Sequence, residues 1–192
     1  MTKLYGLAAV LLLAYPAASP AHQIDKSFTT VSFRPDSLKV MVAIDEADLL
    51  VFFDLDQNRD ELLQREELVA GIPQVFPLVE QHLQVAVDGR PAGLRPIKAD
   101  VGAGGDGTSY LNFYFSAPLE DTPVDLDLQV DFFTGFSDTH RNLATILVPG
   151  KPVIKGVFSR DVTQQHFVVG ERLSWWEELV RTAQGWLGQG QR

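Results

Sequence analysis

The chain has 192 residues, a formal net charge of -9 and no cysteine. The absence of cysteine excludes disulfides, thiolate metal sites and cysteine nucleophiles together. The chain has 25 Asp and Glu against 16 Lys and Arg, and this excess of acids argues against a nucleic-acid partner, which is itself negatively charged. The hydrophobic share of 45% is ordinary for a globular protein, so one principal domain with its own core is expected.

Residues 1–21 have the pattern of an export signal. Lys3 precedes an apolar run over residues 4–15, and small residues ending at Ala21 offer a cleavage site. The run is too short for a stable membrane span. We therefore expect an extracytoplasmic protein, either periplasmic or secreted, with association with a membrane as the alternative, whose mature chain begins at His22.

Short runs rich in Val, Phe, Thr and Ile follow, separated by turn residues. They predict a mainly β fold over residues 22–170, an antiparallel β-sandwich. The expected strands are 24–33, 37–44, 83–87, 94–101, 109–116, 124–133, 141–148, 153–158 and 165–169.

A helical insertion is expected at about residues 45–83, between the early and late strands. Acids at 45, 46 and 48 followed by an apolar run predict a short helix ending near Phe53. The stretch from Arg65 to Leu83 is also helical in pattern. Gly71, Pro73 and Pro77 are expected to break it into two pieces.

The segment between these helices resembles an EF-hand calcium loop. Counting from Asp56 places oxygen ligands at the required positions 1, 3, 5, 7, 9 and 12, and the apolar Leu63 at position 8. The ligands are Asp56, Asn58, Asp60, the carbonyl of Leu62, Gln64 and Glu67. This register predicts a Ca²⁺ or similar hard-cation site.

One position departs from the EF-hand pattern. The sixth residue is normally glycine because the loop turns there with positive φ, and here it is Glu61. Holding a side chain in that conformation costs on the order of 1 kcal/mol. We expect the substitution to weaken cation binding rather than prevent it. The alternative is an acidic connection that keeps the loop shape without a cation.

A second metal site is predicted from histidine. A free His22 would offer a metal both its α-amine and its imidazole, and His140 lies in a short turn before a strand. With Asp138, these residues suit a nickel, copper or zinc ion. The simpler interpretation is that His22 merely marks the processing point.

Residues 171–192 predict a C-terminal amphipathic helix. Ser174 and Glu177 form a capping box, and Trp176 and Trp186 share an apolar face. Such a helix would dock on the sandwich, on a membrane or on a periplasmic protein partner.

Four features together carry a family resemblance: the exported AH start, the DLDQNRDELLQREEL segment, the GDGTSYLNFYF strand and the HRNLA motif. They resemble the extracytoplasmic N-terminal domain of HupE/UreJ-type proteins. That family is associated with nickel or cobalt uptake through a following membrane bundle, which this sequence does not contain. The resemblance implies the domain with its histidine and calcium-type positions, and we expect no transport by this sequence itself.

These features favour a non-enzymatic, exported metal-binding or metal-handling domain. The first alternative is a structural or partner-binding module that docks through its Trp-bearing helix. A less favoured alternative is an oxidative copper enzyme of the histidine-brace type, in which the terminal His22 would bind copper.

Overall fold

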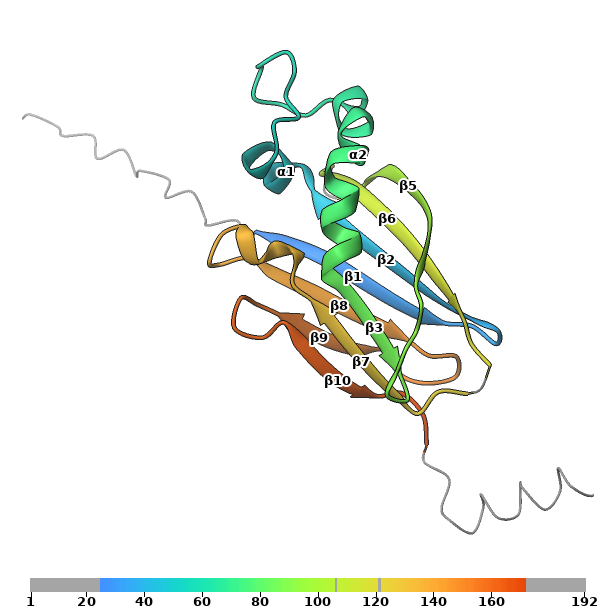
Figure 1. Ribbon diagram of the computed structural model, residues 1–192. Helices are drawn as coiled ribbons and strands as arrows, with labels where there is room; N and C mark the ends of the chain where they lie inside the picture. Colours follow the sequence, from blue (N-terminus) through green and yellow to red (C-terminus); the bar gives the residue numbers. More distant parts are fainter. Residues whose placement is uncertain (1–24, 106, 121, 172–192) are drawn as a thin grey trace, which may run out of the picture.

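A computed structural model describes residues 25–105, 107–120 and 122–171. It is a mainly β protein with two sheets and two α-helices (Figure 1). The predicted export signal, His22 and the predicted C-terminal helix lie outside the described residues. Within the described part, no helix is both long enough and apolar enough to cross a membrane.

The larger sheet has six strands in the order β5-β6-β2-β1-β8-β9. Alternation sets its two faces: along β1 every second residue is buried, with Val31 and Phe33 pointing into the core. The strands are β1 (Lys26–Phe33), β2 (Ser37–Asp45), β5 (Arg95–Ala103), β6 (Ser109–Pro118), β8 (Arg141–Leu147) and β9 (Ile154–Phe158).

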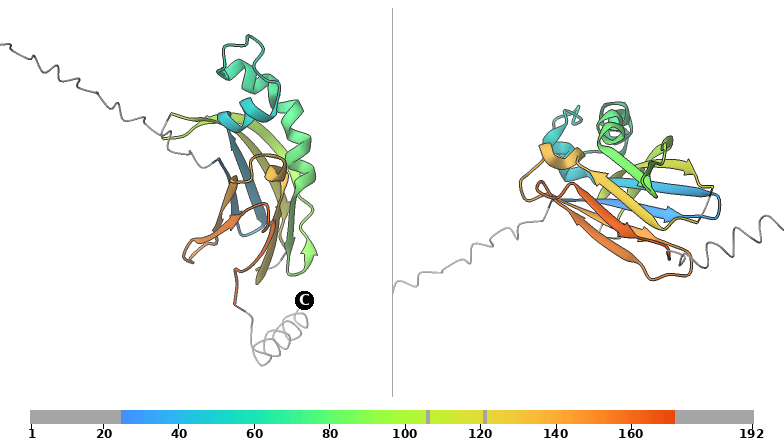
Figure 2. Two further views of the ribbon diagram at one scale, coloured as in Figure 1. Left: turned by 90° about the vertical axis from the view of Figure 1, so that its left-hand side faces the viewer. Right: turned by 60° about the horizontal axis from the view of Figure 1, so that its bottom comes forward.

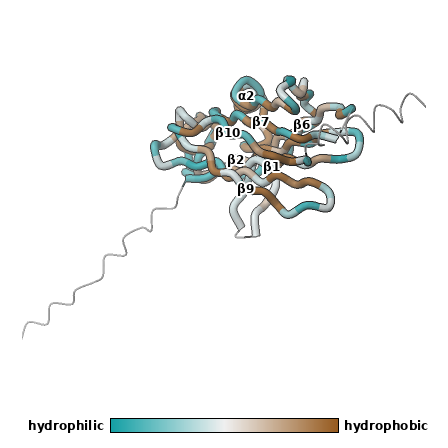
Figure 3. The backbone as a smooth tube through the Cα atoms, turned by 90° about the horizontal axis from the view of Figure 1, so that it is seen from below, coloured by the Kyte–Doolittle hydropathy of each residue, from teal (hydrophilic) through white to brown (hydrophobic). Residues whose placement is uncertain are grey.

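The smaller sheet has four strands in the order β10-β7-β3-β4. They are β3 (Leu83–Val87), β4 (Arg90–Pro91), β7 (Asp125–Val130) and β10 (Gln164–Val168). Both sheets contribute buried side chains to one core, including Phe113 and Ile146 from the larger sheet and Leu126 and Leu128 from the smaller. Figure 3 shows the two layers from below, with β7 and β10 on one side and β1, β2 and β9 on the other.

The helices cover part of the same inner face. Helix α1 (Glu46–Phe52) follows β2, and helix α2 (Arg65–His82) runs along the inner face of the larger sheet, where Phe76 contacts Phe113 and Phe115. In the side view, α2 and the smaller sheet lie on one side of the larger sheet (Figure 2, left). The opposite face of the larger sheet is not covered by any other described helix or strand.

Helix α2 corrects one prediction, because it is continuous where two pieces were expected. Pro73 and Pro77 both lie inside it, and both are exposed. Each proline removes one helical hydrogen bond, and because the prolines lie on the exposed side of the helix, we expect water to satisfy the carbonyls that lose their donor. Burial of Leu68, Val75 and Val79 on the opposite side holds the helix together across the prolines.

Two further predictions are corrected. The sheets are not wholly antiparallel, because β1 and β8 pair in parallel. The predicted strand over residues 124–133 ends at Val130, and Phe132–Gly135 form a 3₁₀ helix, η1. Asp131 leaves the extended conformation at φ -137° and ψ 5°, which turns Phe132 and Phe133 into the core.

Candidate functional site

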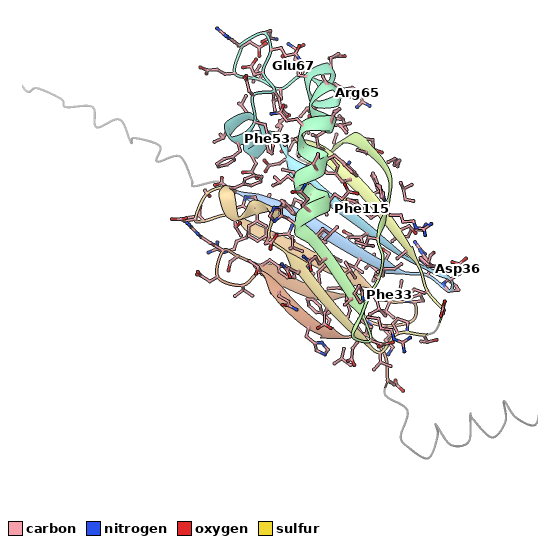
Figure 4. The ribbon with its side chains drawn as sticks, in the orientation of Figure 1. Phe33, Asp36, Phe53, Arg65, Glu67 and Phe115 are labelled. Carbon is pink, nitrogen blue, oxygen red and sulfur yellow. The ribbon has the colours of Figure 1, made fainter. Side chains whose placement is uncertain are left out.

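The predicted calcium-type loop forms a closed unit between α1 and α2. Asp45 caps the first helix by accepting a hydrogen bond from the Asp48 N–H at 2.9 Å. The second helix begins at Arg65, after which Glu67 occupies its first turn. Figure 4 shows Glu67 at the end of α2 that joins the loop. The helix–loop–helix order that the motif needs is therefore present.

Glu67 connects the two ends of the loop. One carboxylate oxygen, Oε1, accepts hydrogen bonds from the N–H groups of Gln57 at 2.9 Å and Asn58 at 3.3 Å. The other, Oε2, accepts from the Gln64 N–H at 3.0 Å. The side chain is buried, with 8% of the residue exposed. Position 12 of the predicted loop is therefore the residue on which the loop closes.

Asp56 organises the first half of the loop. Its Oδ1 accepts from the Arg59 N–H at 2.6 Å and the Asp60 N–H at 3.3 Å, and its Oδ2 accepts from the Glu61 N–H at 2.9 Å. These bonds turn the backbone tightly round one carboxylate. Arg59 and Glu61 both adopt φ 63°, the left-handed region. The sixth position thus has the positive φ that the motif needs, although its residue is not glycine.

The remaining predicted ligand side chains also meet. Asp60 Oδ2 accepts from Asn58 Nδ2 at 3.1 Å and from Gln64 Nε2 at 3.2 Å, and Asn58 Oδ1 accepts from the Asp60 N–H at 2.8 Å. The structure therefore brings together all five predicted side-chain ligands of the loop in one hydrogen-bonded network. Leu62, whose carbonyl was the predicted sixth ligand, is exposed in the same loop.

The loop is held to the body of the protein by apolar contacts. Leu55 and Leu63 are buried, and Leu55 packs so closely on α2 that a Cβ added at Gly71 would lie 2.7 Å from its methyl carbons. A residue with a side chain at position 71 would displace Leu55. A hydrogen bond from Arg65 Nη1 to the Val101 carbonyl of β5, at 3.2 Å, also connects the start of α2 to the larger sheet.

The loop carboxylates do not already surround a single point. Among residues 25–105, 107–120 and 122–171, no three His, Cys, Asp or Glu side chains are grouped so that they could hold a metal ion. The carboxylates instead accept backbone N–H bonds. Cation binding would therefore replace some of these bonds, above all those that Glu67 accepts from Gln57 and Asn58.

His140 is placed differently from the prediction. Its side chain is fully buried and stacks on Phe133 at a centroid distance of 5.2 Å, with the edge of Phe136 at the same distance. Asp138 is exposed and forms an ion pair with Arg160 instead. The structure thus does not join Asp138 to His140. His22, the other predicted ligand, lies outside the described residues.

The polar partners of His140 come from distant parts of the chain. Its Nε2 lies 3.0 Å from the Ser27 hydroxyl, and its Nδ1 lies 3.3 Å from Asp48 Oδ2 without a hydrogen bond. Asn142 Nδ2 donates to the same Ser27 oxygen at 2.9 Å. The sequence analysis did not predict the contact between Ser27 and His140, because no local pattern indicates a contact between residues 113 positions apart.

The order serine, histidine, aspartate is that of a hydrolytic triad. Here, however, Ser27 is 0% exposed, Asp48 is 3% exposed and His140 is 1% exposed. Because all three side chains are buried, none is exposed to solvent where a substrate would bind, and this burial fits a structural role. The carboxyl of Asp45 belongs to the same buried region, and its desolvation raises the pKa of that group, with Coulombic repulsion from Asp48 acting in the same direction.

The other two described histidines pair with acids at the surface of the smaller sheet. His82 Nδ1 lies 2.7 Å from Asp131, and His166 Nδ1 lies 2.9 Å from Asp127. Each histidine side chain is about half exposed.

A search of protein-family models and of curated proteins finds no match to this chain.

Proposed function

We propose that this chain is an exported, non-enzymatic domain whose loop from Asp56 to Glu67 binds a hard cation, with Ca²⁺ the first choice. The observation that carries the proposal is the φ of 63° at Glu61, the sixth position of the loop. A residue other than glycine adopts this conformation at a cost. In this loop the strained residue is Glu61, at the sixth position, where a calcium loop turns with positive φ.

Charge gives the second line of support. Five acids lie within the 12 consecutive residues from Asp56 to Glu67, and only two bases, Arg59 and Arg65, accompany them. Carboxylate and amide oxygens are the ligands that calcium prefers. A bound cation would offset the mutual repulsion of these carboxylates, which outnumber the two arginines of the segment.

The existing hydrogen bonds set the expected strength. Because Glu67 has to exchange bonds with Gln57 and Asn58 for a bond to the cation, binding is weaker than in loops prepared for the ion. We expect a dissociation constant of roughly 10⁻⁴ to 10⁻³ M, the range of extracellular calcium modules. Such a site would be filled outside cells and empty in the cytoplasm.

Calorimetric titration of the purified chain with Ca²⁺ and Mg²⁺ tests the proposal. Asp60→Asn should remove most of the calcium heat, because it deletes a ligand charge inside the loop. Asp54→Asn is the matched control, since Asp54 is exposed and lies outside the ligand positions. Equal titrations for the two variants, or no saturable heat in the unaltered chain, would contradict cation binding by this loop.

A transition-metal site at His22 is the second candidate. One observation favours its location: Asp25 enters β1 beside the turn before β8, where its carbonyl accepts from the Arg141 N–H at 3.0 Å. His22 stands three residues earlier, a reach of at most about 10 Å. His140 is buried, so it would join such a site only if its turn opened.

Mass determination of the mature terminus, followed by titration with nickel, copper and zinc, tests this second site. A His22→Ala variant should lose the binding, and the loop variant Asp60→Asn should retain it. The copper-oxygenase alternative depends on the same His22, and partner docking depends on the segment after residue 171. Both stay predictions, because these residues lie outside the described part of the chain.

The HupE/UreJ-type resemblance belongs to the same proposal. What supports it is that the acidic loop precedes a long helix and that the HR motif opens a late strand, β8. On this proposal the domain works outside the cytoplasm, binding or passing on a metal ion. Detection of the processed chain in a periplasmic or culture fraction tests the location.

A further inference from the structure

The outer face of the six-stranded sheet has a charge opposite to that of the whole protein. Strand alternation and register identify the outward residues: Lys98, Tyr114 and Met41 stand side by side on neighbouring strands, as do Lys39 and Ser116. Six basic side chains occupy outward positions in the described strands. They are Lys26, Lys39, Arg95, Lys98, Arg141 and Lys155, and we call this surface the basic face.

Acids are scarce on the basic face. Among the described strands of the six-stranded sheet, Asp100 is the only solvent-accessible acid at an outward position, and it is paired with Lys98. Asp45, at the end of β2, is buried. The chain as a whole has 25 acids against 16 bases. A local excess of cations on a net-negative protein means that any anionic partner is attracted to this face and repelled by the rest.

The basic face also carries large apolar and aromatic groups. Phe28 and Tyr110 meet edge to face at 5.9 Å, with Lys26 Nζ 5.9 Å from the Phe28 ring. Lys98 Nζ lies 4.4 Å from the Tyr114 ring. Beside these rings is a hollow of about 370 Å³, lined mainly by apolar groups. Its walls are Phe28, Thr30, Met41, Ala43, Tyr110, Asn112 and the strand end at residues 102–104.

We propose that the basic face docks on an anionic lipid bilayer, with lysine and arginine at the headgroup phosphates and the aromatic hollow taking apolar lipid groups. Charge complementarity selects an anionic partner, and the hollow selects one with apolar parts, which a soluble polyanion lacks. Aromatic rings with polar edges are favoured at the membrane interface. Each basic group at such a surface strengthens binding by roughly fivefold.

Vesicle co-sedimentation of the full chain tests the proposal. Vesicles of phosphatidylcholine with added phosphatidylglycerol should bind it at low salt, and vesicles of phosphatidylcholine alone should bind it much less. High salt should release the protein, because it screens the headgroup charge. The triple variant Lys26→Gln, Lys39→Gln, Lys155→Gln should weaken binding to the anionic vesicles by at least about tenfold.

A matched variant makes the test specific. Arg34→Gln, Arg90→Gln, Lys151→Gln removes the same number of charges from exposed positions outside the strands of the six-stranded sheet, and should retain binding. Circular dichroism confirms that both triple variants fold. Equal losses from the two variants would overturn the proposal. So would binding that is unaffected by the first variant, or equally tight binding to soluble polyphosphate.

Discussion

The loop from Asp56 to Glu67 and the buried group around His140 organise carboxylates in opposite ways. In the loop, every hydrogen-bond partner lies within 10 residues, and most side chains reach solvent. Around His140, the partners come from β1, α1 and β8, and all are buried. A cation can replace hydrogen bonds in the loop, whereas in the buried group any change has to be absorbed by the core. On the proposed function the first region binds a cation, whereas the second contributes to stability.

The largest expected effect is on the buried side of this comparison. His140→Ala removes the ring that stacks on Phe133 and leaves Asp48 without the group beside it. Truncating a large buried side chain to alanine costs about 2–5 kcal/mol through lost contacts and the cavity that it leaves. Urea denaturation measures the loss.

His166→Ala is the control for that variant. His166 is about half exposed and pairs with Asp127 at the surface, so its removal should cost less than about 1 kcal/mol. Similar losses for the two histidines would show that the buried group contributes no more to stability than a surface pair.

The next largest expected effect is a loss of stability in the loop from Asp56 to Glu67, measured without a cation. Glu67→Gln keeps the shape of the side chain but removes its charge and one of its two acceptor oxygens. Charge-assisted hydrogen bonds each contribute about 1.5–3 kcal/mol, so we expect a loss of about 2 kcal/mol in chelator. Glu66→Gln, at an exposed position in the same turn of α2, should lose only about 0.3–1 kcal/mol of stability, because it removes a favourable interaction with the helix dipole.

The same contrast decides what could be predicted from the sequence. The short first helix and strands such as β2 depend on local spacing, and the structure has them within one or two residues of the predicted bounds. The pairing of β1 with β8 depends on no local signal, because a parallel pair leaves the same alternation as an antiparallel one. The burial of His140 likewise could not be predicted from the local sequence, because it depends on where Ser27 and Asp48 lie in the fold.

The helix α2 shows a different limit. Pro73 and Pro77 are strong local signals for a break, and the prediction followed them. They are four residues apart and so fall on one side of the helix, which here faces solvent. Which side of a helix is buried is decided by the sheet beneath it, and that information is not local.

A smaller effect is expected at the sixth loop position. Glu61→Gly should relieve the left-handed backbone and raise stability by up to about 1 kcal/mol, less the entropy that glycine adds to the unfolded chain. Calcium affinity should rise with it, because the turn is then adopted without strain. Thermal unfolding in chelator and calorimetry with Ca²⁺ measure the two parts.

Two glycine variants sharpen this result. Arg59→Gly relieves the same φ of 63° at a position that is not the sixth, so it should gain similar stability. Gln57→Gly, where φ is not positive, should instead lose about 0.5–1 kcal/mol. A loss of stability in Glu61→Gly as large as that in Gln57→Gly would mean that the turn holds no strain.

The smallest effect concerns the pH dependence of the buried region. Desolvation raises the pKa of Asp45 above its value in the unfolded chain, so folding favours the neutral carboxyl. The corresponding stability is fully present below the unfolded pKa and is lost as the pH rises through the folded pKa. Above the folded pKa the ionised Asp45 therefore opposes folding, although its hydrogen bond to the Asp48 N–H still caps α1.

Asp45→Asn separates these two roles, since asparagine caps a helix about as well as aspartate. The variant should unfold at a higher temperature than the unaltered chain at pH 7, and the difference should shrink as the pH falls and Asp45 becomes neutral. Asp36→Asn, at an exposed turn, should show no such trend. If Asp45→Asn were less stable at pH 7, attraction between Asp45 and His140 would outweigh desolvation, and the buried group would be an ion-pair network.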